Sequence, residues 1–333
     1  MSTIKDVANL AGVSICTVSR VLADKNYIRP ETRKKVMNAV HELDYKPNHT
    51  ARSLKTGNTN TIGLLLPDIC NLYYIKITKY IEQYSDQNKY MILLCDTNES
   101  VEKEKRMVGL LQDRSVDGVI VLPTSQSIQH ILKLEDYGIP YVFLNRNFPD
   151  VKACIPTDNY YGGYAMMDHL IQNGHKKIAM LFPSFDNPIY FERFDGAKDA
   201  LRAAGLDVNV KNIFYDIVDM HDAHDRVTAR MREPDPPTAF FAGNDMLCFG
   251  IYSALNELGL RIPQDVSVAG YDDISTSAMI EPALTTFWQP EEELAKLGVD
   301  YLLALMNGES PSRPVKLRGK VIARDSVAEA PDK

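Results

Sequence analysis

The 333-residue sequence contains no apolar run that approaches the ~20 residues needed to cross a bilayer. It begins with "MSTIKDVANL", in which Asp6 stands where a secretory signal peptide has its apolar core. The five cysteines are widely scattered and none forms a C-x-x-C pair, so neither a disulfide framework nor a zinc ribbon is indicated. We therefore expect a cytoplasmic protein with reduced thiols and no contact with a membrane.

Sequence patterns typical of catalysis and metal binding are also missing. There is no phosphate-binding loop, no G-x-G-x-x-G after a strand and no G-x-S-x-G around a serine. His221 and His224 have no further His or Cys nearby, so a zinc site is not indicated. Asp272 and Asp273 are neighbours in a loop, an arrangement in which two carboxylates seldom face each other for acid-base catalysis. We expect no enzyme, no metal and no other cofactor.

Charge is unevenly distributed along the chain. Residues 1–60 contain ten Lys or Arg and five Asp or Glu, which gives a net charge of +5. Since the whole chain carries −7, the remaining residues carry −12. A basic segment ahead of an acidic body indicates that only the first segment contacts a polyanion.

The first 45 residues have the pattern of three short helices. Thr3 and Asp6 form a capping pair ahead of an apolar stripe that Gly12 interrupts, and Ser14 is a suitable N-cap for a second helix. The inward apolar positions of the second and third helices are Val18, Val21, Leu22, Val36, Val40 and Leu43. Two helices joined by a tight turn with a glycine predict a helix-turn-helix, although such pairs also occur in helical domains that bind no DNA.

The stretches "TIKDVANLAGVSICTVSRVL" and "RPETRKKVMNAVHELDYKPNHTARSLKTG" resemble, without a gap, the DNA-binding head and hinge of the lactose and galactose repressor (LacI/GalR) family. The resemblance implies that Ile15 and Cys16 contact bases, and that Arg20 contacts a guanine or a phosphate. Neither Ile15 nor Cys16 hydrogen-bonds strongly, so for Ile15 we expect contact with a thymine methyl group. The DNA-binding residues that the resemblance implies are Ser14, Ile15, Cys16, Thr17, Ser19, Arg20, Asn26, Asn48, Ala51, Arg52, Leu54 and Lys55.

The segment "NHTARSLKTG" at 48–57 places a leucine inside a basic connector. The resemblance implies that this hinge becomes helical on the operator and wedges Leu54 between base pairs in the minor groove. Unstacking a base step costs a few kcal/mol, which is offset by contacts along the bent duplex. The alternative is that Leu54 packs against the body of the protein.

From residue 61 onward, short apolar runs alternate with amphipathic helical stretches. The predicted strands are Ile62–Leu66, Met91–Cys95, Gly118–Leu122, Tyr141–Leu144, Ile178–Phe182, Ile213–Tyr215, Thr238–Ala242 and Val266–Tyr271. Strands separated by helices predict parallel, doubly wound sheets, and two comparable sets predict two subdomains with a ligand cleft at the carboxyl ends of the strands. The segment 284–291 is expected to cross back to the first subdomain.

This part resembles the periplasmic-binding-protein-like effector domain of the same family, in phrases such as "TIGLLLPD", "VDGVIVLP", "AFFAGNDMLCFG" and "VSVAGYDD". We therefore expect a small all-α helix-turn-helix head plus an α/β body with two doubly wound parallel-sheet subdomains. The expected boundaries are 1–47 for the DNA-binding domain, 48–60 for the hinge helix and linker, and 61–328 for the effector-binding and dimerisation domain. Within the last, we expect an N-subdomain of about 61–157 plus 290–317 and a C-subdomain of about 158–289 plus 318–328.

The expected effector-binding residues follow the predicted strands or lie at the crossover. They are Tyr73, Tyr74, Asn145, Arg146, Arg193, Asn244, Asp272 and Trp288. The resemblance implies that Asp272 takes two ligand hydroxyls and that Arg193 hydrogen-bonds the effector. Asn145 stands where sugar-responsive members often have Asp. The amide removes a charge, which weakens the case for an unmodified hexose as the effector. The tyrosines could instead line a subdomain contact, and Trp288 could equally be a core residue.

The combined pattern predicts a sequence-specific transcriptional regulator, most simply a repressor, that binds a palindromic operator as a homodimer. A small-molecule effector, expected to be a sugar or sugar derivative, would control it from the cleft. The alternatives are a cytoplasmic solute-binding protein or an enzyme on the same body fold, and the basic head and the lack of a phosphate loop weigh against them. A phosphoprotein corepressor, which some members use, is indicated by no residue pattern here. Whether the effector releases or tightens DNA binding is left open.

Overall fold

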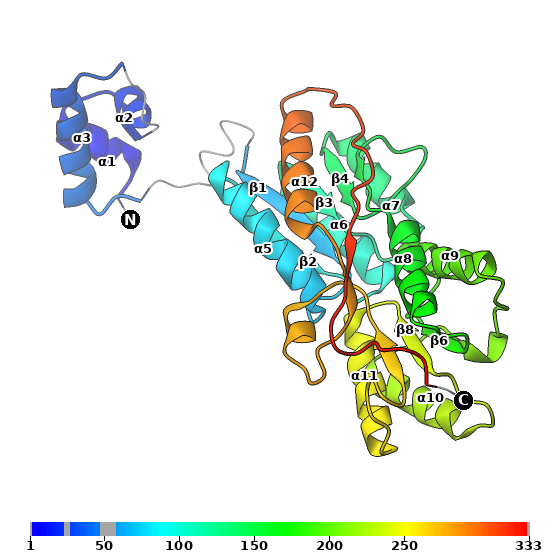
Figure 1. Cartoon of the computed structure of the whole chain (residues 1–333). Helices are drawn as coiled ribbons and strands as arrows, with labels where there is room; N and C mark the ends of the chain where they lie inside the picture. The colour runs from blue at the N-terminus through cyan, green and yellow to red at the C-terminus, as the bar shows by residue number, and fades with distance from the viewer. Residues whose placement is uncertain (1, 23–26, 47–57, 332–333) are drawn as a thin grey trace. The chain divides into compact units, whose positions relative to one another are not determined.

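The computed structural model describes residues 2–22, 27–46 and 58–331 of the chain. Its contacts divide the chain into two units, Met1–Thr59 and Asn60–Lys333, which we call the head and the body. Figure 1 draws the helices of the head in blue and the elements of the body from cyan to red. Each unit encloses its own hydrophobic core, as expected of separately folding domains.

The head contains three helices in its described residues. They are α1 (Ile4–Ala11), α2 (Ile15–Leu22) and α3 (Pro30–Glu42). The Thr3 side chain accepts from the Asp6 N–H, and the Asp6 carboxylate accepts from the Thr3 N–H at 2.8 Å, so the predicted capping box is present. Gly12 ends α1 at a φ of 64°, in the left-handed conformation that glycine adopts without strain. The helices close on a core of Val7, Ala8, Val18, Val21, Val36 and Ala39.

The first sheet of the body is entirely parallel, with the strand order β2-β1-β3-β4-β5. Its strands are β1 (Thr61–Leu66), β2 (Met91–Asp96), β3 (Gly118–Val121), β4 (Tyr141–Leu144) and β5 (Cys154–Ile155). Its helices are α5 (Leu72–Gln87), α6 (Val101–Asp113), α7 (Gln129–Leu132), η1 (Lys133–Tyr137) and α12 (Glu291–Met306). Leu64 packs in the cluster with α5 and α12, and its neighbour Leu65 packs in the cluster with α6 and α7, so both faces of the sheet are covered.

The second sheet repeats this arrangement with the parallel strand order β7-β6-β8-β9. Its strands are β6 (Ile178–Leu181), β7 (Ile213–Phe214), β8 (Ala239–Ala242) and β9 (Ser267–Ala269). Its helical segments are α8 (Asn159–Gln172), α9 (Pro188–Ala203), η2 (Val210–Asn212), α10 (Met220–Arg232), α11 (Asp245–Glu257) and η3 (Ser275–Ala278). One face packs on α8 and α9 and the other on α10 and α11. The predicted pair of doubly wound sheets is therefore confirmed.

The crossover segments between the two sheets pair with one another. β10 (Thr286–Trp288) runs antiparallel to β11 (Lys320–Ile322), and Thr157 forms an isolated parallel bridge with Leu317. β5, β10 and β11 were not among the predicted strands, because each has two or three residues and, unlike β7 and β9, does not lie inside a longer predicted run. The last predicted strand, 266–271, ends early at Ala269 because the Gly270 and Asp272 N–H groups donate to Thr285 and Phe287 of the crossover.

Candidate functional site

The first turn of α2 is an exposed face of the head. The Ser14 Oγ accepts from the Thr17 N–H at 3.1 Å, which confirms Ser14 as the cap of this helix. Ile15 is 44% exposed, Cys16 and Ser19 are exposed, and Thr17 is half-buried. An apolar side chain and a thiol on an open helical surface are available for contact with a partner.

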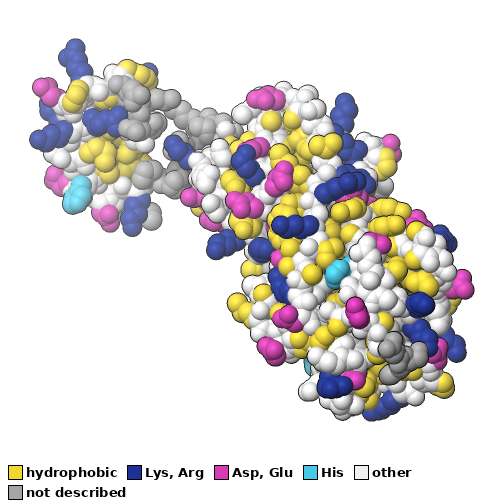
Figure 2. All heavy atoms as spheres, in the orientation of Figure 1, with side chains coloured by type: hydrophobic (Ala, Val, Ile, Leu, Met, Phe, Trp, Pro, Cys, Tyr) yellow, Lys and Arg dark blue, Asp and Glu magenta, His cyan; other side chains and the backbone are white. Residues whose placement is uncertain are grey.

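Basic side chains accompany this face. The guanidinium of Arg20 lies 5.9 Å from the centroid of the Tyr27 ring, and Arg20 itself is exposed. Figure 2 shows several Lys and Arg side chains on the visible face of the head. The predicted DNA-binding residues Asn26, Asn48, Ala51, Arg52, Leu54 and Lys55 lie outside the residues that the structure describes.

In the body, tyrosines from both subdomains lie among buried charges. Asn71 caps α5 by accepting from the Tyr73 N–H, and this places Tyr73 and Tyr74, 3% and 2% exposed, in the first turn. Burial raises the pKa of Tyr74 to about 12, and it raises the pKa of Tyr73 well above its usual value, with the charge of Asp272 adding to the rise. Burial also raises the pKa of Tyr190 of α9. All three phenols therefore keep their protons at neutral pH.

Arg193 is the most heavily bonded of the predicted effector residues. Its Nε donates to Asn159 Oδ1 at 2.9 Å and its Nη1 donates to the Gly243 carbonyl at 2.6 Å. The same Nη1 lies 3.5 Å from Asp272 Oδ1, and the guanidinium carbon lies 3.6 Å from the centroid of the Tyr271 ring. With 1% of its surface exposed, this guanidinium is held rigidly inside the body.

The position of Arg193 in the sequence suggests that it opens a helix, and this is wrong, because Arg193 lies within α9. α9 starts one and a half turns earlier, at Pro188, where the Asn187 side chain accepts from the Ile189 N–H. Asn followed by Pro at the first helical position is a helix start that the sequence alone could have revealed.

Asp272 follows β9 in an unusual setting. Its φ is 115°, outside the conformations that side chains other than glycine prefer, and its Oδ1 accepts from Gln289 Nε2 at 2.7 Å. Burial raises the pKa of Asp272 to about 8, and the positive charge of Arg193 opposes that rise. A strained, buried carboxylate with so few partners is typical of a functional site.

Asn145 and Arg146 follow β4 and are both buried. Asn145 has no exposed surface, and its amide bonds only to protein: Nδ2 donates to Tyr73 Oη at 3.2 Å, while Oδ1 accepts from Asn159 and Thr157. Arg146 donates from Nη1 and Nη2 to the carbonyls of Asn145 and Pro123, at 2.8 and 2.6 Å. Its Nε has no hydrogen-bond partner among the described residues.

The two remaining predicted effector residues differ in their surroundings. Asn244 is the N-cap of α11 through an acceptor bond from the Leu247 N–H, and its Nδ2 lies 3.4 Å from Tyr190 Oη. Trp288 lies on β10 and is half-buried, with the Lys320 ammonium 5.6 Å from its ring centroid. The structure thus brings all the predicted effector residues except Trp288 into one buried group, which we call the strand-end cluster together with Tyr190. It consists of Tyr73, Tyr74, Asn145, Arg146, Tyr190, Arg193, Asn244 and Asp272.

Sequence reasoning missed the side chains that connect this cluster. Asn159 bonds to two of its predicted members, and Tyr190 and Gln289 bond to one each. Gln289 Oε1 is buried without a partner among the described residues. Tyr190 lies one helical turn before Arg193, a spacing that could have suggested a shared face. No local signal distinguishes Asn159 or Gln289, because their partners in the cluster are 14 or more residues away in sequence.

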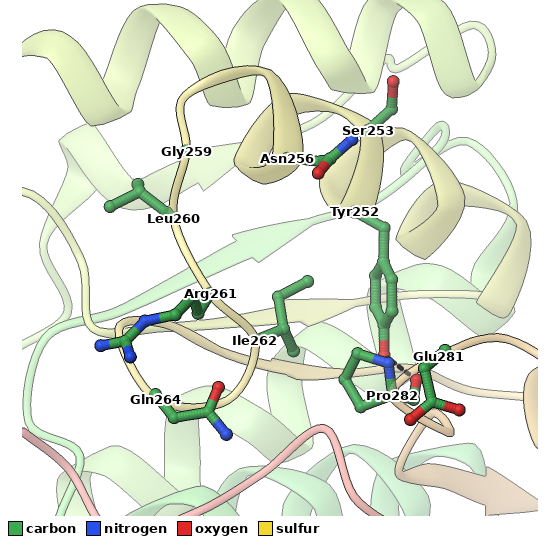
Figure 3. Close-up of a pocket in the computed structure, with 10 residues that line it drawn as sticks. All are labelled: Tyr252, Ser253, Asn256, Gly259, Leu260, Arg261, Ile262, Gln264, Glu281 and Pro282. Carbon is green, nitrogen blue, oxygen red and sulfur yellow. Dashed lines mark hydrogen bonds between the residues drawn. The ribbon is translucent and has the colours of Figure 1, made fainter.

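A separate hollow of about 660 Å³ lies on the C-terminal side of the body and shares no residue with the strand-end cluster. Figure 3 shows Tyr252, Ser253 and Asn256 on one side of it and a loop that contains Ile262 on the other. Tyr252 Oη donates to the Pro282 carbonyl at 3.0 Å, and Arg261, which also lines the hollow, pairs with Asp265. Because Tyr252 and Arg261 already bond to neighbours here, whereas the strand-end cluster gathers the predicted effector residues, we place the candidate ligand site at the strand-end cluster.

Metal and membrane sites receive no support from the described residues. Within 2–22, 27–46 and 58–331, no three His, Cys, Asp or Glu side chains are grouped as metal ligands. The His224 ring lies 3.0 Å from both Asp225 and Glu257, which makes it part of a surface charge group. No helix in the described part of the chain is long and apolar enough to cross a membrane.

Two family models match the chain. The model for bacterial regulatory proteins of the lacI family matches residues 3–48, and the model for a periplasmic binding protein-like domain matches residues 167–327. The HTH-type transcriptional repressor PurR of Vibrio vulnificus is 36% identical over 330 residues, which cover 98% of this chain and 99% of the relative.

Solved structures give the same result. The Lac repressor dimer bound to operator and the anti-inducer ONPF aligns with a TM-score of 0.89 and 27% identity, covering 98% of this chain and 99% of that one. The complex of the transcriptional regulator CelR with cellobiose aligns with a TM-score of 0.73 and 28% identity, covering 98% of this chain and all of the other. These relatives are regulators, so the expectation that the chain is not an enzyme agrees with them.

Proposed function

The chain belongs to the LacI family of DNA-binding transcriptional repressors, and on that premise we propose that it binds a palindromic operator as a homodimer under the control of a small molecule held by the strand-end cluster. We place its action in the cytoplasm. One head offers few contacts, and pairing two heads on two half-sites is the usual remedy. The observation that carries the ligand site is the buried contact between Arg193 and Asp272, surrounded by tyrosines.

We assign operator contact to the exposed first turn of α2. Ile15 is placed to meet a thymine methyl, Cys16 meets the neighbouring base, and Arg20 meets a guanine or a phosphate. Ser14, Thr17 and Ser19 provide hydroxyl groups for phosphate oxygens. This assignment is supported by the exposure of the side chains and by the net positive charge of the first 60 residues.

For the hinge we propose the contacts that its sequence implies, although residues 47–57 lie outside the described part of the chain. Leu54 wedges into the minor groove, with Asn48, Ala51, Arg52 and Lys55 beside it, and Asn26 joins the contacts of the head. The Leu54→Ala variant should lose operator affinity while its melting temperature and effector affinity stay near those of the wild type. Earlier melting with unchanged operator affinity would show that Leu54 is a core residue.

We propose that the effector is a sugar or sugar derivative. A carboxylate and a guanidinium hold adjacent hydroxyl groups, and tyrosine rings pack on the apolar face of a sugar. Arg146 Nε and Gln289 Oε1, which have no partner among the described residues, offer one donor and one acceptor for further ligand atoms. One structural relative, the transcriptional regulator CelR, was solved with cellobiose, which supports a sugar as the first class of compound to test.

The strand-end cluster must open to admit a ligand, since none of its members is more than 5% exposed. Separation of the two subdomains would expose it, and the same movement changes the distance between the two heads of a dimer. Effector and operator affinities are then reciprocally linked, typically by ~1–3 kcal/mol. Either sign of this coupling fits the geometry.

Two measurements test the proposal. An operator duplex recovered by selection from random palindromes should lose ~10³-fold or more in affinity between 50 and 200 mM salt, as phosphate contacts release counterions. A calorimetric screen of sugars, sugar phosphates and purines should find a compound that stabilises the body by ~2.7 kcal/mol at 100 times its Kd, and Asp272→Ala should abolish the effect. DNA binding that does not depend on salt would refute the proposed regulator. An unchanged thermal response in Asp272→Ala would refute the strand-end cluster as the ligand site.

A further inference from the structure

A row of side-chain hydrogen bonds connects the two subdomains through the first crossover. Arg193 Nε donates to Asn159 Oδ1 at 2.9 Å, Asn159 Nδ2 donates to Asn145 Oδ1 at 3.1 Å, and Asn145 Nδ2 donates to Tyr73 Oη at 3.2 Å. We call the two asparagines, Asn145 and Asn159, the amide relay. They lie at the two ends of the first crossover, one directly after β4 and the other at the start of α8.

The relay is shielded from water along its whole length. Asn145 is 0% exposed, Asn159 1%, Arg193 1% and Tyr73 3%. Thr157 braces the middle, because its hydroxyl donates to Asn145 Oδ1 and accepts from Asn159 Nδ2 at 3.0 Å. In such a dry environment a hydrogen bond made in the wrong direction leaves two donors or two acceptors facing each other, and the mismatch is costly.

Arg193 determines the direction of the whole row. A guanidinium has only donors, so the end of Asn159 that faces it must be the oxygen. The NH₂ group of Asn159 then faces Asn145 and requires an oxygen there, which turns the NH₂ group of Asn145 toward Tyr73. One donor-only group therefore sets the orientation of both amides.

The direction of the relay decides what Tyr73 can offer. Its oxygen accepts from Asn145, and among the described residues no acceptor takes the Tyr73 hydroxyl proton. A buried hydroxyl group whose proton has no partner is destabilising. The unpaired proton is therefore the part of Tyr73 that is available to a bound molecule.

We propose that Asn145 and Asn159 are positioning residues that hold Tyr73 as a hydrogen-bond donor, so that the effector group at Tyr73 is an oxygen acceptor, such as an ether or carbonyl oxygen. This inference rests on the proposed function, which places the effector at the strand-end cluster. It also gives a physical role to the amide at position 145. An aspartate there would accept the tyrosine proton and leave only lone pairs for the ligand.

The test measures the relay directly and uses no effector, so its failure is distinct from a failure of the proposed function. In full-length protein labelled with ¹⁵N-asparagine, the side-chain amide signals of Asn145 are assigned by their loss in Asn145→Asp, or in Asn145→Ser if the first variant does not fold. Tyr73→Phe keeps the aromatic ring and removes the hydroxyl group, and with it the acceptor of the Asn145 Nδ2 proton. One of the two Asn145 Nδ2 protons should move upfield in this variant, and an unchanged pair of signals overturns the proposal.

A reversal experiment separates direction from mere packing. In Asn159→Asp, the new carboxylate still accepts from Arg193 but cannot donate to Asn145, so the Asn145 amide should turn and donate to that carboxylate. Tyr73→Phe in that background should then leave the Asn145 protons where they are. Thr157→Val is the matched control, because it removes a bond to Asn145 without altering the direction, and the response to Tyr73→Phe should persist. The same response to Tyr73→Phe in the Asn159→Asp background as in the wild type would overturn the relay.

Discussion

The α2 face of the head and the strand-end cluster of the body use the same kinds of side chain in opposite ways. Arg20 is exposed and lies near a tyrosine ring, whereas Arg193 is 1% exposed and bonds to a side chain, a carbonyl and a carboxylate. The head presents exposed groups to a partner, while the strand-end cluster satisfies most of its polar groups internally. Surface contact needs only exposure and charge, but control by a small molecule needs groups whose partners can be exchanged.

Substitution of the two arginines tests this difference most directly. Arg193→Ala leaves Asp272 buried without its positive neighbour and removes the donor of Asn159, so we expect a loss of ~3–5 kcal/mol in the free energy of unfolding. Chemical denaturation of the body measures it. A loss below ~1 kcal/mol would mean that water replaces the guanidinium and satisfies the groups that it leaves behind.

Arg20→Ala is the matched change in the head. Since Arg20 is exposed, the free energy of unfolding should change by less than ~0.5 kcal/mol. Operator affinity should fall by ~1–3 kcal/mol if Arg20 bonds a guanine, with a relaxed preference at one base pair. A uniform loss across operator sequences with a shallower salt dependence would assign Arg20 to a phosphate instead.

Asp272→Asn tests the buried charge of the cluster through the pH dependence of the free energy of unfolding. The pKa of Asp272 rises on folding from 3.8 to about 8, so the folded state holds the proton more tightly and stability falls as pH rises through this window. The pKa of Asp245, another buried acid, rises to about 6, and the shifted pKa values of His169, His175 and His224 also contribute near neutral pH. The contribution of Asp272 is therefore the difference between the wild type and Asp272→Asn. Between about pH 6 and 8 the wild type should lose stability with rising pH, and the variant should lose less.

Denaturation of wild type and Asp272→Asn at several pH values measures this difference. Equal slopes would show that Arg193 keeps Asp272 ionised throughout the window. The cluster would then resemble an ordinary buried ion pair.

Ser14→Ala should have a modest effect, confined to the stability of the head. Loss of the cap of α2 should cost ~1 kcal/mol of head stability, because the Thr17 N–H loses its acceptor. Ser19→Ala is the control, since Ser19 is an exposed serine of the same helix without a capping role. Urea denaturation, followed by the circular dichroism of the helices, measures the unfolding of the head in the two variants. Equal stability of both variants would contradict the capping role.

The sequence predicted well those features that depend on neighbours along the chain. The Thr3 and Ser14 caps, the turn at Gly12 and the eight predicted strands arise from local spacing, and the structure contains all of them. All members of the strand-end cluster except Tyr190 could be predicted from the sequence, because parallel strands bring their carboxyl ends together and because the family resemblance implies Arg193 and Asp272. The DNA contacts of the head and hinge residues and the effector contacts of the cluster residues stay predictions.

Partnerships across long sequence separations could not be predicted. Asn145 looked like a ligand contact, yet its amide connects residues 72 positions before it and 14 after it. Gln289 holds Asp272 from the second crossover, which no periodicity marks. Such contacts depend on how the crossover segments pair, and β10 and β11 are too short to be recognised in a sequence.

The position of Trp288 gives the protein an optical property of its own. Trp288 is the sole tryptophan of the chain and lies on the second crossover, beside the Lys320 ammonium and in a backbone bridge with Asp272. A nearby cation alters the emission of an indole ring, so any movement of β10 against β11 changes the intensity or colour of the emitted light. Intrinsic tryptophan fluorescence therefore reports on the crossover alone, with no contribution from the head, in the unlabelled wild-type chain.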